Sequence, residues 1–312
     1  MPNRCPILSS WSSRATRGIC FFFCLGLLYP VAAVANDAPT RPGILGISYV
    51  TTSVSDICKA RDFYSGLVSR PLRCLKNERA RGGVVPISSS QFIALSKEPP
   101  VGGTNAVLRV VFLTENVKKL REYLRASGIQ TNSEGVPSKT YLTIIDPEGH
   151  RLSFLQKGPQ GHPLSPGPID LRIIHAGFIV HDRAAMEHFY KDILGFRPYW
   201  HGGMKDDETS WVSLQVPDGT DWLEFMLYDD SKADQRFRGI MNHIALGVTD
   251  IHAAQEQLRK NGAPLTEEPK IGRDGKWQLN LYDPDLTRIE FMEFTPKEKP
   301  CCSEFTAPHP KP

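Results

Sequence analysis

The feature that most constrains the fold of this chain is an internal duplication. The segment YVTTSVSDICKARDFYSGLVSRP (49–71) resembles HAGFIVHDRAAMEHFYKDILGFRP (175–198). FLTENVKKLREYLRASG likewise resembles LGVTDIHAAQEQLRKNG, and YLTIIDPEGHRLSFLQ resembles LNLYDPDLTRIEFMEF, in the same order and at offsets of 126 to 137 residues. Ordered matches at a nearly constant offset indicate a repeated structural unit. We therefore predict two homologous domains, 43–157 and 171–296, joined by a Pro/Gly-rich linker at 158–170.

Each predicted domain shows the same succession twice: a strand, a helix and three strand-like stretches. In the second domain, Asp182 and Asp250 each stand at the start of a helix, and a glycine follows the end of each. The predicted elements there are strands at 175–180, 197–200, 210–216, 222–228, 243–248, 277–282 and 287–294, and helices at 182–194 and 250–260. The pattern predicts an α+β protein with four βαβββ modules, two in each domain.

The first 35 residues have the pattern of a secretory signal peptide. Three arginines (Arg4, Arg14 and Arg17) precede an apolar run at 19–34, and the run ends in a small-residue cleavage site. We predict cleavage after Ala35 and a secreted or periplasmic protein with no stable membrane insertion. The alternative is an uncleaved membrane anchor, for which the apolar run is short. Without the three arginines the chain has 34 basic and 34 acidic residues, so it lacks the positive excess typical of nucleic-acid binding.

Four cysteines remain after the predicted cleavage. An even number in an exported protein permits disulfides, and Cys58, Cys74, Cys301 and Cys302 allow three pairings that the sequence leaves open. Cys301 and Cys302 are adjacent in a Pro/Lys-rich tail, 297–312, where we expect them to be surface thiols or tail staples.

Four polar residues interrupt apolar strands of the second domain, namely His175, Glu224, His243 and Glu290, at gaps of 49, 19 and 47 residues. Because alternate residues of a strand share a face, each can point to a concave sheet surface while its neighbours pack on the helices. Burying carboxylates without a compensating charge is costly, whereas two carboxylates and two imidazoles are typical ligands of one divalent metal ion. We therefore predict one metal site; the alternative is that each residue is satisfied separately by hydrogen bonds or salt bridges.

The strand faces also predict a substrate pocket. The residues that share a face with Glu224 or Glu290 are predicted to bind substrate: Trp222, Met226, Arg288 and Met292. Trp211 and Trp277 are further candidates for an apolar wall. The same alternation places Ile174 on the opposite, helix-facing side of its strand.

The motifs IIHAGFIV, MNHIALGVTD and YDPDLTRIEFMEF, at this spacing and within paired βαβββ modules, resemble those of the vicinal oxygen chelate superfamily. That superfamily includes glyoxalase I, extradiol dioxygenases, epimerases and antibiotic-resistance proteins such as the bleomycin resistance protein. The resemblance extends from Gly43 to Phe294. It implies that the four modules are arranged as two paired-module glyoxalase-like domains with concave mixed sheets. It also implies a small-molecule substrate and one divalent metal ion (zinc, nickel, manganese, cobalt or iron(II)), with no organic cofactor.

The first domain lacks this ligand set. Alignment of the repeats gives the counterparts of the four ligands, in chain order, as Tyr49, a residue near Phe92, Arg109 and Ser153. None of these is a metal ligand of the expected kind. We therefore predict that the fold is duplicated and the metal site is not.

The ligand count separates the branches of the superfamily. By resemblance, a His-Glu-His-Glu set is that of glyoxalase I and the epimerases, in which the metal stabilises an enolate and a carboxylate moves a proton. Glu290 or Glu224 would be that base. The extradiol branch binds Fe(II) through two histidines and one glutamate, which His175, His243 and Glu290 also match. Glu224 counts against that branch, where a catalytic histidine is expected near this position.

We therefore expect a glyoxalase-like isomerase or lyase that acts on a substrate with adjacent oxygens. The alternative is a ring-cleaving dioxygenase, and a second alternative is a protein that sequesters a small molecule without catalysis. A complete metal set argues against sequestration, which needs no ion. The predicted export separates the protein from cytosolic glutathione, so the glyoxalase I substrate itself is not implied. The sequence leaves a homodimer open.

Overall fold

The computed structural model describes residues 39–69, 71–72, 74, 82–101, 105–131, 138–158, 171–228 and 241–312. The predicted signal peptide and nearly all of the predicted linker therefore lie outside the described residues. The elements below belong to one unit, residues 38–312. Within the described ranges, no helix is both long and apolar enough to cross a membrane.

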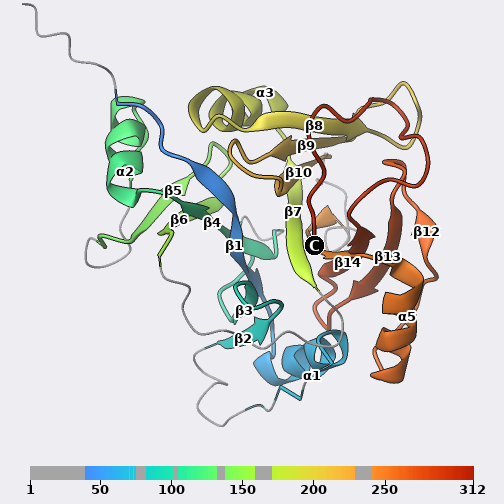
Figure 1. Cartoon of the computed structure of the whole chain (residues 1–312). Coiled ribbons are helices and arrows are strands. Elements are labelled where there is room, and N and C mark those ends of the chain that lie inside the picture. Colours follow the sequence, from blue (N-terminus) through green and yellow to red (C-terminus); the bar gives the residue numbers. More distant parts are fainter. Residues whose placement is uncertain are drawn as a thin grey trace, which may run out of the picture. The chain divides into compact units, whose positions relative to one another are not determined.

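Six strands from the first half of the chain form a mixed sheet in the order β2-β3-β1-β4-β6-β5 (Figure 1). The elements of this half are β1 (Ile44–Ser53), α1 (Ile57–Leu67), β2 (Gly83–Pro86), β3 (Phe92–Ser96), β4 (Val107–Thr114), α2 (Val117–Ala126), β5 (Tyr141–Ile145) and β6 (Arg151–Gln156). Each module here shows one strand, one helix and two strands. A third strand after the helix is not among the described elements of either module, and residues 75–81 and 132–137 lie outside the described residues.

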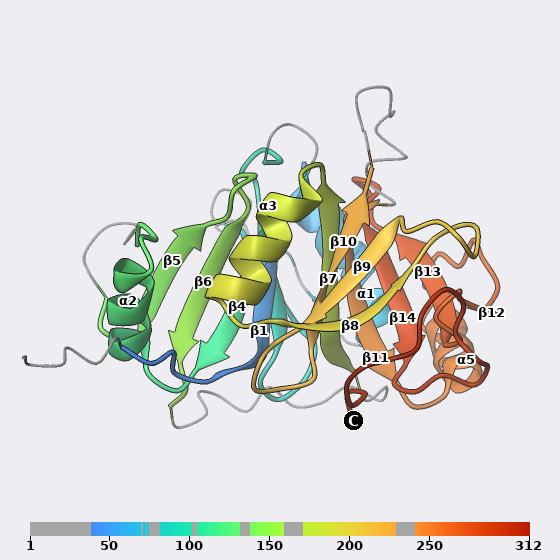
Figure 2. The same cartoon turned by 90° about the horizontal axis from the view of Figure 1, so that it is seen from above.

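Eight strands from the second half form another mixed sheet, in the order β12-β13-β14-β11-β7-β10-β9-β8 (Figure 2). Its elements are β7 (Arg172–Val180), α3 (Arg183–Glu187), the π-helical turn η2 (His188–Ile193), β8 (Arg197–Gly202), β9 (Trp211–Gln215), β10 (Trp222–Leu227), β11 (His243–Val248), α5 (Ile251–Lys260), β12 (Lys270–Ile271), β13 (Trp277–Tyr282) and β14 (Arg288–Glu293). Both modules are βαβββ, as predicted, although β12 was not among the strands located from the sequence. The α+β class with two mixed sheets is confirmed.

A short polar side chain begins one helix in each module. Asp56, Asn116, Asp182 and Asp250 each accept a hydrogen bond from a backbone N–H in the first turn, at 2.8 to 3.0 Å. Such N-caps satisfy N–H groups that have no partner within the helix. The repeated cap fixes where each helix begins and so how it lies on its sheet.

A bulge in β7 overturns one of the face predictions. Ile173 and His175 both pair with residues of β11, whereas Ile174 between them has no partner there. Ile174 therefore packs with aromatic residues on the cavity side of the sheet instead of the helix-facing core. The prediction for Ile174 was wrong because a bulge inserts one residue and resets the alternation of faces. A bulge also occurs at the equivalent place in β1, between Ile47 and Tyr49.

Two polar side chains join the halves of the molecule along β1 and β7. The Gln91 amide donates to the carbonyl oxygens of Ile47 (2.8 Å) and Ile173 (3.0 Å) and accepts from the Ile173 N–H. Asp221 accepts the Ile47 N–H at 2.8 Å and is paired with Arg172. Buried backbone groups that would otherwise lack partners are thereby satisfied where β1 and β7 meet.

Candidate metal centre

Four adjacent strands, in the order β14-β11-β7-β10, each bring one predicted ligand to the same face of the sheet. Residues that pair across these strands form two rows on this face. The first row is Glu290, Ala245, His175 and Trp222. The second row is Arg288, His243, Gly177 and Glu224. In each row the two ligands are separated by alanine or glycine. A Cβ at Gly177 would overlap the His243 ring, so this glycine provides the space that the imidazole occupies.

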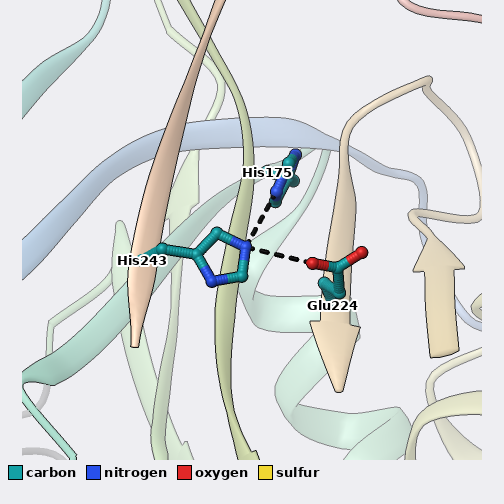
Figure 3. A group of neighbouring side chains, drawn as sticks. All are labelled: His175, Glu224 and His243. Carbon is teal, nitrogen blue, oxygen red and sulfur yellow. Dashed lines mark hydrogen bonds and ion pairs between the residues drawn. The ribbon is translucent and has the colours of Figure 1, made fainter. Parts of the chain in front are cut away.

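The donor atoms of the four residues converge, and Figure 3 shows three of them, from His175, Glu224 and His243. His243 Nε2 lies 3.0 Å from His175 Nε2 and 3.2 Å from Glu224 Oε2. Glu290 Oε2 lies 3.5 Å from the first histidine nitrogen (His175) and 3.8 Å from the second (His243). The donors of His175, Glu224 and His243 all lie within 4.8 Å of one another, and Glu290 lies outside that group of three.

These separations fit coordination to one ion. Metal–nitrogen and metal–oxygen bonds of about 2.0 to 2.1 Å in a tetrahedral site place neighbouring donors about 3.3 Å apart. The measured contacts of 3.0 to 3.8 Å bracket that value. The residues present therefore suit a divalent metal, with Glu224 in the compact group and Glu290 next to the two imidazoles.

The protonation states of these groups also suit a metal. Burial opposes ionisation of Glu290, but Arg288 and the two histidines outweigh it and hold the pKa of Glu290 far below its usual range. Burial likewise opposes ionisation of Glu224, yet His243 lowers the pKa of this carboxyl overall. Burial, with help from Arg288, lowers the pKa of His243. Ionised carboxylates and a neutral imidazole are the forms that bind a metal ion.

Neighbouring groups hold the ligands in place. The Nδ1 of His243 lies 3.2 Å from the carbonyl oxygen of Met241, so an Nδ1–H can donate to it and leave Nε2 free for the metal. The ring of His175 stacks on Trp222, with centroids 4.4 Å apart. Both histidine side chains are fully buried, and Glu224 is 15% exposed toward the cavity.

The equivalent face of the first half is filled by other side chains. The corresponding rows are Ser153, Val111, Tyr49 and Phe92, and then Arg151, Arg109, Thr51 and Ala94. The counterpart of Glu224 is therefore Ala94, and the prediction near Phe92 was two residues out, because the parallel pairing of β1 with β3 sets the register. Among the described residues of this half no group of metal-binding side chains is found.

A cavity of about 410 Å³ opens beside the four donors. All four residues predicted to bind substrate line it: Trp222, Met226, Arg288 and Met292. The Arg288 guanidinium lies 3.7 Å from Glu290, and its buried Nε has no hydrogen-bond partner within the described part of the chain. Trp211 also lines the cavity. A predominantly apolar space with a few charged groups next to a metal-binding set is typical of a small-molecule site.

The prediction that Trp277 lines the cavity was wrong. Its ring packs against His252 of α5, with centroids 4.9 Å apart, on the helix-facing side of β13. Gln278 and Asn280 on the other face line the cavity instead. His181 and His201 do not line the cavity.

Strand alternation could not place several cavity residues. Met204, Met241, Arg273, Asp274 and Phe305 lie outside the predicted strands, and Tyr199 and Trp200 are consecutive residues of β8, next to a bulge. Phe305 belongs to the predicted tail, which in the structure packs against β8. The four cysteines form the pairs Cys58–Cys74 and Cys301–Cys302.

Comparison with known proteins agrees with this geometry. A family model described as the Glyoxalase/Bleomycin resistance protein/Dioxygenase superfamily matches residues 172–291, the part that contains all four donors. The chain is 30% identical over 125 residues to the lactoylglutathione lyase of Haemophilus influenzae, which covers 39% of this chain and 93% of that relative.

Solved structures share the fold over both halves. A variant of homoprotocatechuate 2,3-dioxygenase from Brevibacterium fuscum superposes with a TM-score of 0.60 at 20% identity and covers 82% of this chain and 73% of its own. A catechol 2,3-dioxygenase gives a TM-score of 0.60 at 15% identity over 86% of this chain and 96% of its own.

Proposed function

Because the chain belongs to the glyoxalase/bleomycin resistance protein/dioxygenase superfamily, we propose that it is a metal-dependent isomerase or lyase of the glyoxalase type. The observation that carries this proposal is the position of Glu224. Its carboxylate lies 3.2 Å from His243 in the compact donor group, so the site has two carboxylates, as expected for the four-ligand branch. The sequence match to a lactoylglutathione lyase supports the same branch.

His175, Glu224, His243 and Glu290 would hold one divalent ion, which when bound would polarise adjacent substrate oxygens and stabilise negative charge that develops there. Glu290 and Glu224 are the candidate bases, since each is ionised and lines the cavity. A general base must lie within hydrogen-bond reach of the proton it takes. Arg288 can hold an anionic oxygen of the substrate, and the apolar wall excludes water.

A ring-cleaving dioxygenase is the second candidate. It is favoured by the shared fold with two dioxygenases over both halves of the chain, and by the proximity of Glu290 to both histidines. The presence of Glu224 in the donor group weighs against it, because a two-histidine, one-carboxylate iron site leaves the remaining positions to substrate and oxygen.

The test is metal analysis of protein purified without added ions, together with an oxygen-uptake assay on catechol. The expected result is nickel, zinc, cobalt or manganese in the protein and no oxygen uptake. Iron with oxygen uptake on catechol would overturn the proposal in favour of the dioxygenase. Metal-free protein that binds a small molecule tightly would indicate sequestration.

We further propose that the protein acts outside the cytoplasm as a secreted or periplasmic enzyme, on the basis of the signal-peptide pattern in residues 1–35. Protein recovered from the exported fraction should begin at Asn36. An intact N-terminus in the membrane fraction would indicate an anchor instead. Light scattering of the purified protein tests the homodimer.

A further inference from the structure

The segment Cys301–His309, here called the strap, runs along β8, the outermost strand of the eight-stranded sheet (Figure 1). The Thr306 N–H donates to the carbonyl oxygen of Tyr199 at 3.0 Å, and its hydroxyl donates to that of Pro198 at 2.6 Å. Ser303 makes two further bonds of 2.9 Å to the backbone of His201. These contacts hold the strap beside a strand whose outer edge would otherwise lack partners.

The strap delivers one aromatic side chain to the cavity. The ring of Phe305 lies 4.9 Å from the Tyr199 ring and 4.7 Å from the His309 ring, measured between centroids, and it lines the cavity next to Trp200. His309 Nδ1 in turn lies 2.6 Å from the Tyr199 hydroxyl. Strap residues before and after Phe305 therefore hold it in place, because Ser303 and Thr306 bond to β8 and His309 contacts the Tyr199 hydroxyl.

A buried ammonium group connects this ring to the metal-binding face. The Nζ of Lys276 is fully buried and lies 5.1 Å from the Phe305 ring, 5.3 Å from Tyr199 and 4.6 Å from Trp222. Within the part of the chain that the structure describes, its one hydrogen bond goes to the Tyr199 hydroxyl, at 3.2 Å. A desolvated cation is attracted to the faces of aromatic rings, so Lys276 draws three rings into one wall. Trp222 in that wall stacks on His175.

The cavity beside this wall is suited to an apolar group. Its lining includes large, polarizable side chains that face the same space: Trp200, Trp211, Met204, Met226, Met292 and Phe305. The metal-binding carboxylates Glu224 and Glu290 line the same cavity as Phe305. A ligand with a polar head and an apolar body can therefore meet the donors and Phe305 in one space.

We infer that Phe305 determines substrate specificity, and that the substrate carries a large apolar group, flat or ring-shaped, next to its pair of adjacent oxygens. This inference rests on the proposed function, because it requires the head of the substrate to reach the metal-binding residues. It adds the chemical class of the remainder of the molecule and assigns its recognition to the strap.

The test compares two chelating probes that differ only in the apolar group, acetohydroxamate and benzohydroxamate. Binding to cobalt-loaded protein is followed by the visible absorption of the ion. Burying a phenyl group in place of a methyl group should favour benzohydroxamate by at least about tenfold in Kd. In Phe305→Ala the ratio of the two Kd values should fall most of the way to the ratio that cobalt shows in solution without protein. Acetohydroxamate should bind this variant as it binds the unmodified chain.

Two further variants control the result. Glu304→Ala removes the exposed neighbour of Phe305 on the strap, which does not line the cavity, and should keep the full preference. Phe305→Leu keeps an apolar side chain and should keep part of it, which also serves if the alanine variant does not fold.

Equal binding of both probes by the unmodified protein would overturn the inference while leaving the metal site intact. An equal loss for both probes in Phe305→Ala and Phe305→Leu would show that the strap only supports the site, and would also overturn it. A cobalt spectrum that neither probe changes would contradict the proposed function itself, and the inference with it.

Discussion

Trp222 stacks on His175 with ring centroids 4.4 Å apart, and in the first half Phe92 stacks on Tyr49 at the same distance. The two pairs occupy equivalent positions in the two sheets, so the stack belongs to the repeated fold, and the second half uses it to orient a ligand. Among the described residues the Nδ1 of His175 has no hydrogen-bond partner, which leaves the stack to fix the ring.

Removing this stack should weaken metal binding. Trp222→Ala is expected to reduce the affinity for zinc or cobalt about tenfold, the effect typical of losing a group that orients a ligand. Trp222→Phe keeps a ring against His175 and should retain most of the affinity. Titration in competition with a chromophoric chelator measures both. Equal affinities for the alanine variant and the unmodified protein would show that the stack does not orient His175.

Replacing His243 should abolish metal binding. His243→Ala removes the nitrogen that lies next to the donors of His175, Glu224 and Glu290, and the first half should remain folded. The matched control is Arg109→Ala, at the equivalent position of the other sheet, which should leave the metal content unchanged. Metal content per chain by elemental analysis, with circular dichroism, provides the readout. Full metal content in the first variant would refute the site.

Gly177, in the second row, should also be needed for full metal affinity. Gly177→Ala introduces a Cβ where the His243 ring lies, so the imidazole must move and metal affinity should fall about 10- to 100-fold. Thr51→Ala, the equivalent position in the first half, should have no effect on the metal. An alanine variant that binds metal normally would mean that the His243 ring lies elsewhere when the ion is bound.

Two tyrosine–aspartate contacts link modules that are far apart in the sequence. The burial of one of these aspartates, Asp283, should make the stability of the protein depend on pH. The Tyr190 hydroxyl donates to Asp146 at 3.0 Å, and the Tyr64 hydroxyl approaches Asp283 at 3.5 Å. Burial raises the pKa of Asp283 to about 7, although two backbone N–H groups oppose it. The folded protein therefore holds this proton more tightly than the unfolded chain, and the associated stability is lost as the pH rises from about 4 to about 7.

Asp283→Asn removes that dependence because an amide does not ionise. Relative to the variant, the unmodified protein should lose stability on the order of 2 to 4 kcal/mol between pH 4 and pH 7, with little change above. Urea unfolding at each pH gives the free energies. The exposed Asp207→Asn serves as control and should show a difference nearly independent of pH. A pH-independent difference for Asp283→Asn would show that its carboxyl ionises normally in the folded state.

The sequence predicted the parts of this molecule that depend on local pattern. Helix starts followed from side chains that cap their own first turn, and the four donors followed from alternation within single strands. The duplication then placed equivalent strands in equivalent sheets. Local pattern and duplication together were therefore sufficient to predict the fold and the position of the four donors.

The remaining features depend on pairing between strands and on returning segments. Ile174 changed face because of a bulge, and the counterpart of Glu224 moved to Ala94 because the register of β1 with β3 is set across the sheet. Trp277 lies on the face of β13 that packs against α5, which its aromatic character alone did not indicate. Phe305 follows the last strand, and only its long-range contacts with Tyr199 and Lys276 bring it to the cavity.

The strap along β8 has a consequence for the behaviour of the protein in concentrated solution. A sheet edge with free N–H and C=O groups is a template on which a second molecule can add its own strand. Ser303 and Thr306 occupy such groups of β8. A chain shortened after residue 300 should therefore keep its four metal donors and yet self-associate, so that turbidity appears before the metal is lost. The strap that brings Phe305 to the cavity would then also keep one molecule from adding its sheet edge to another.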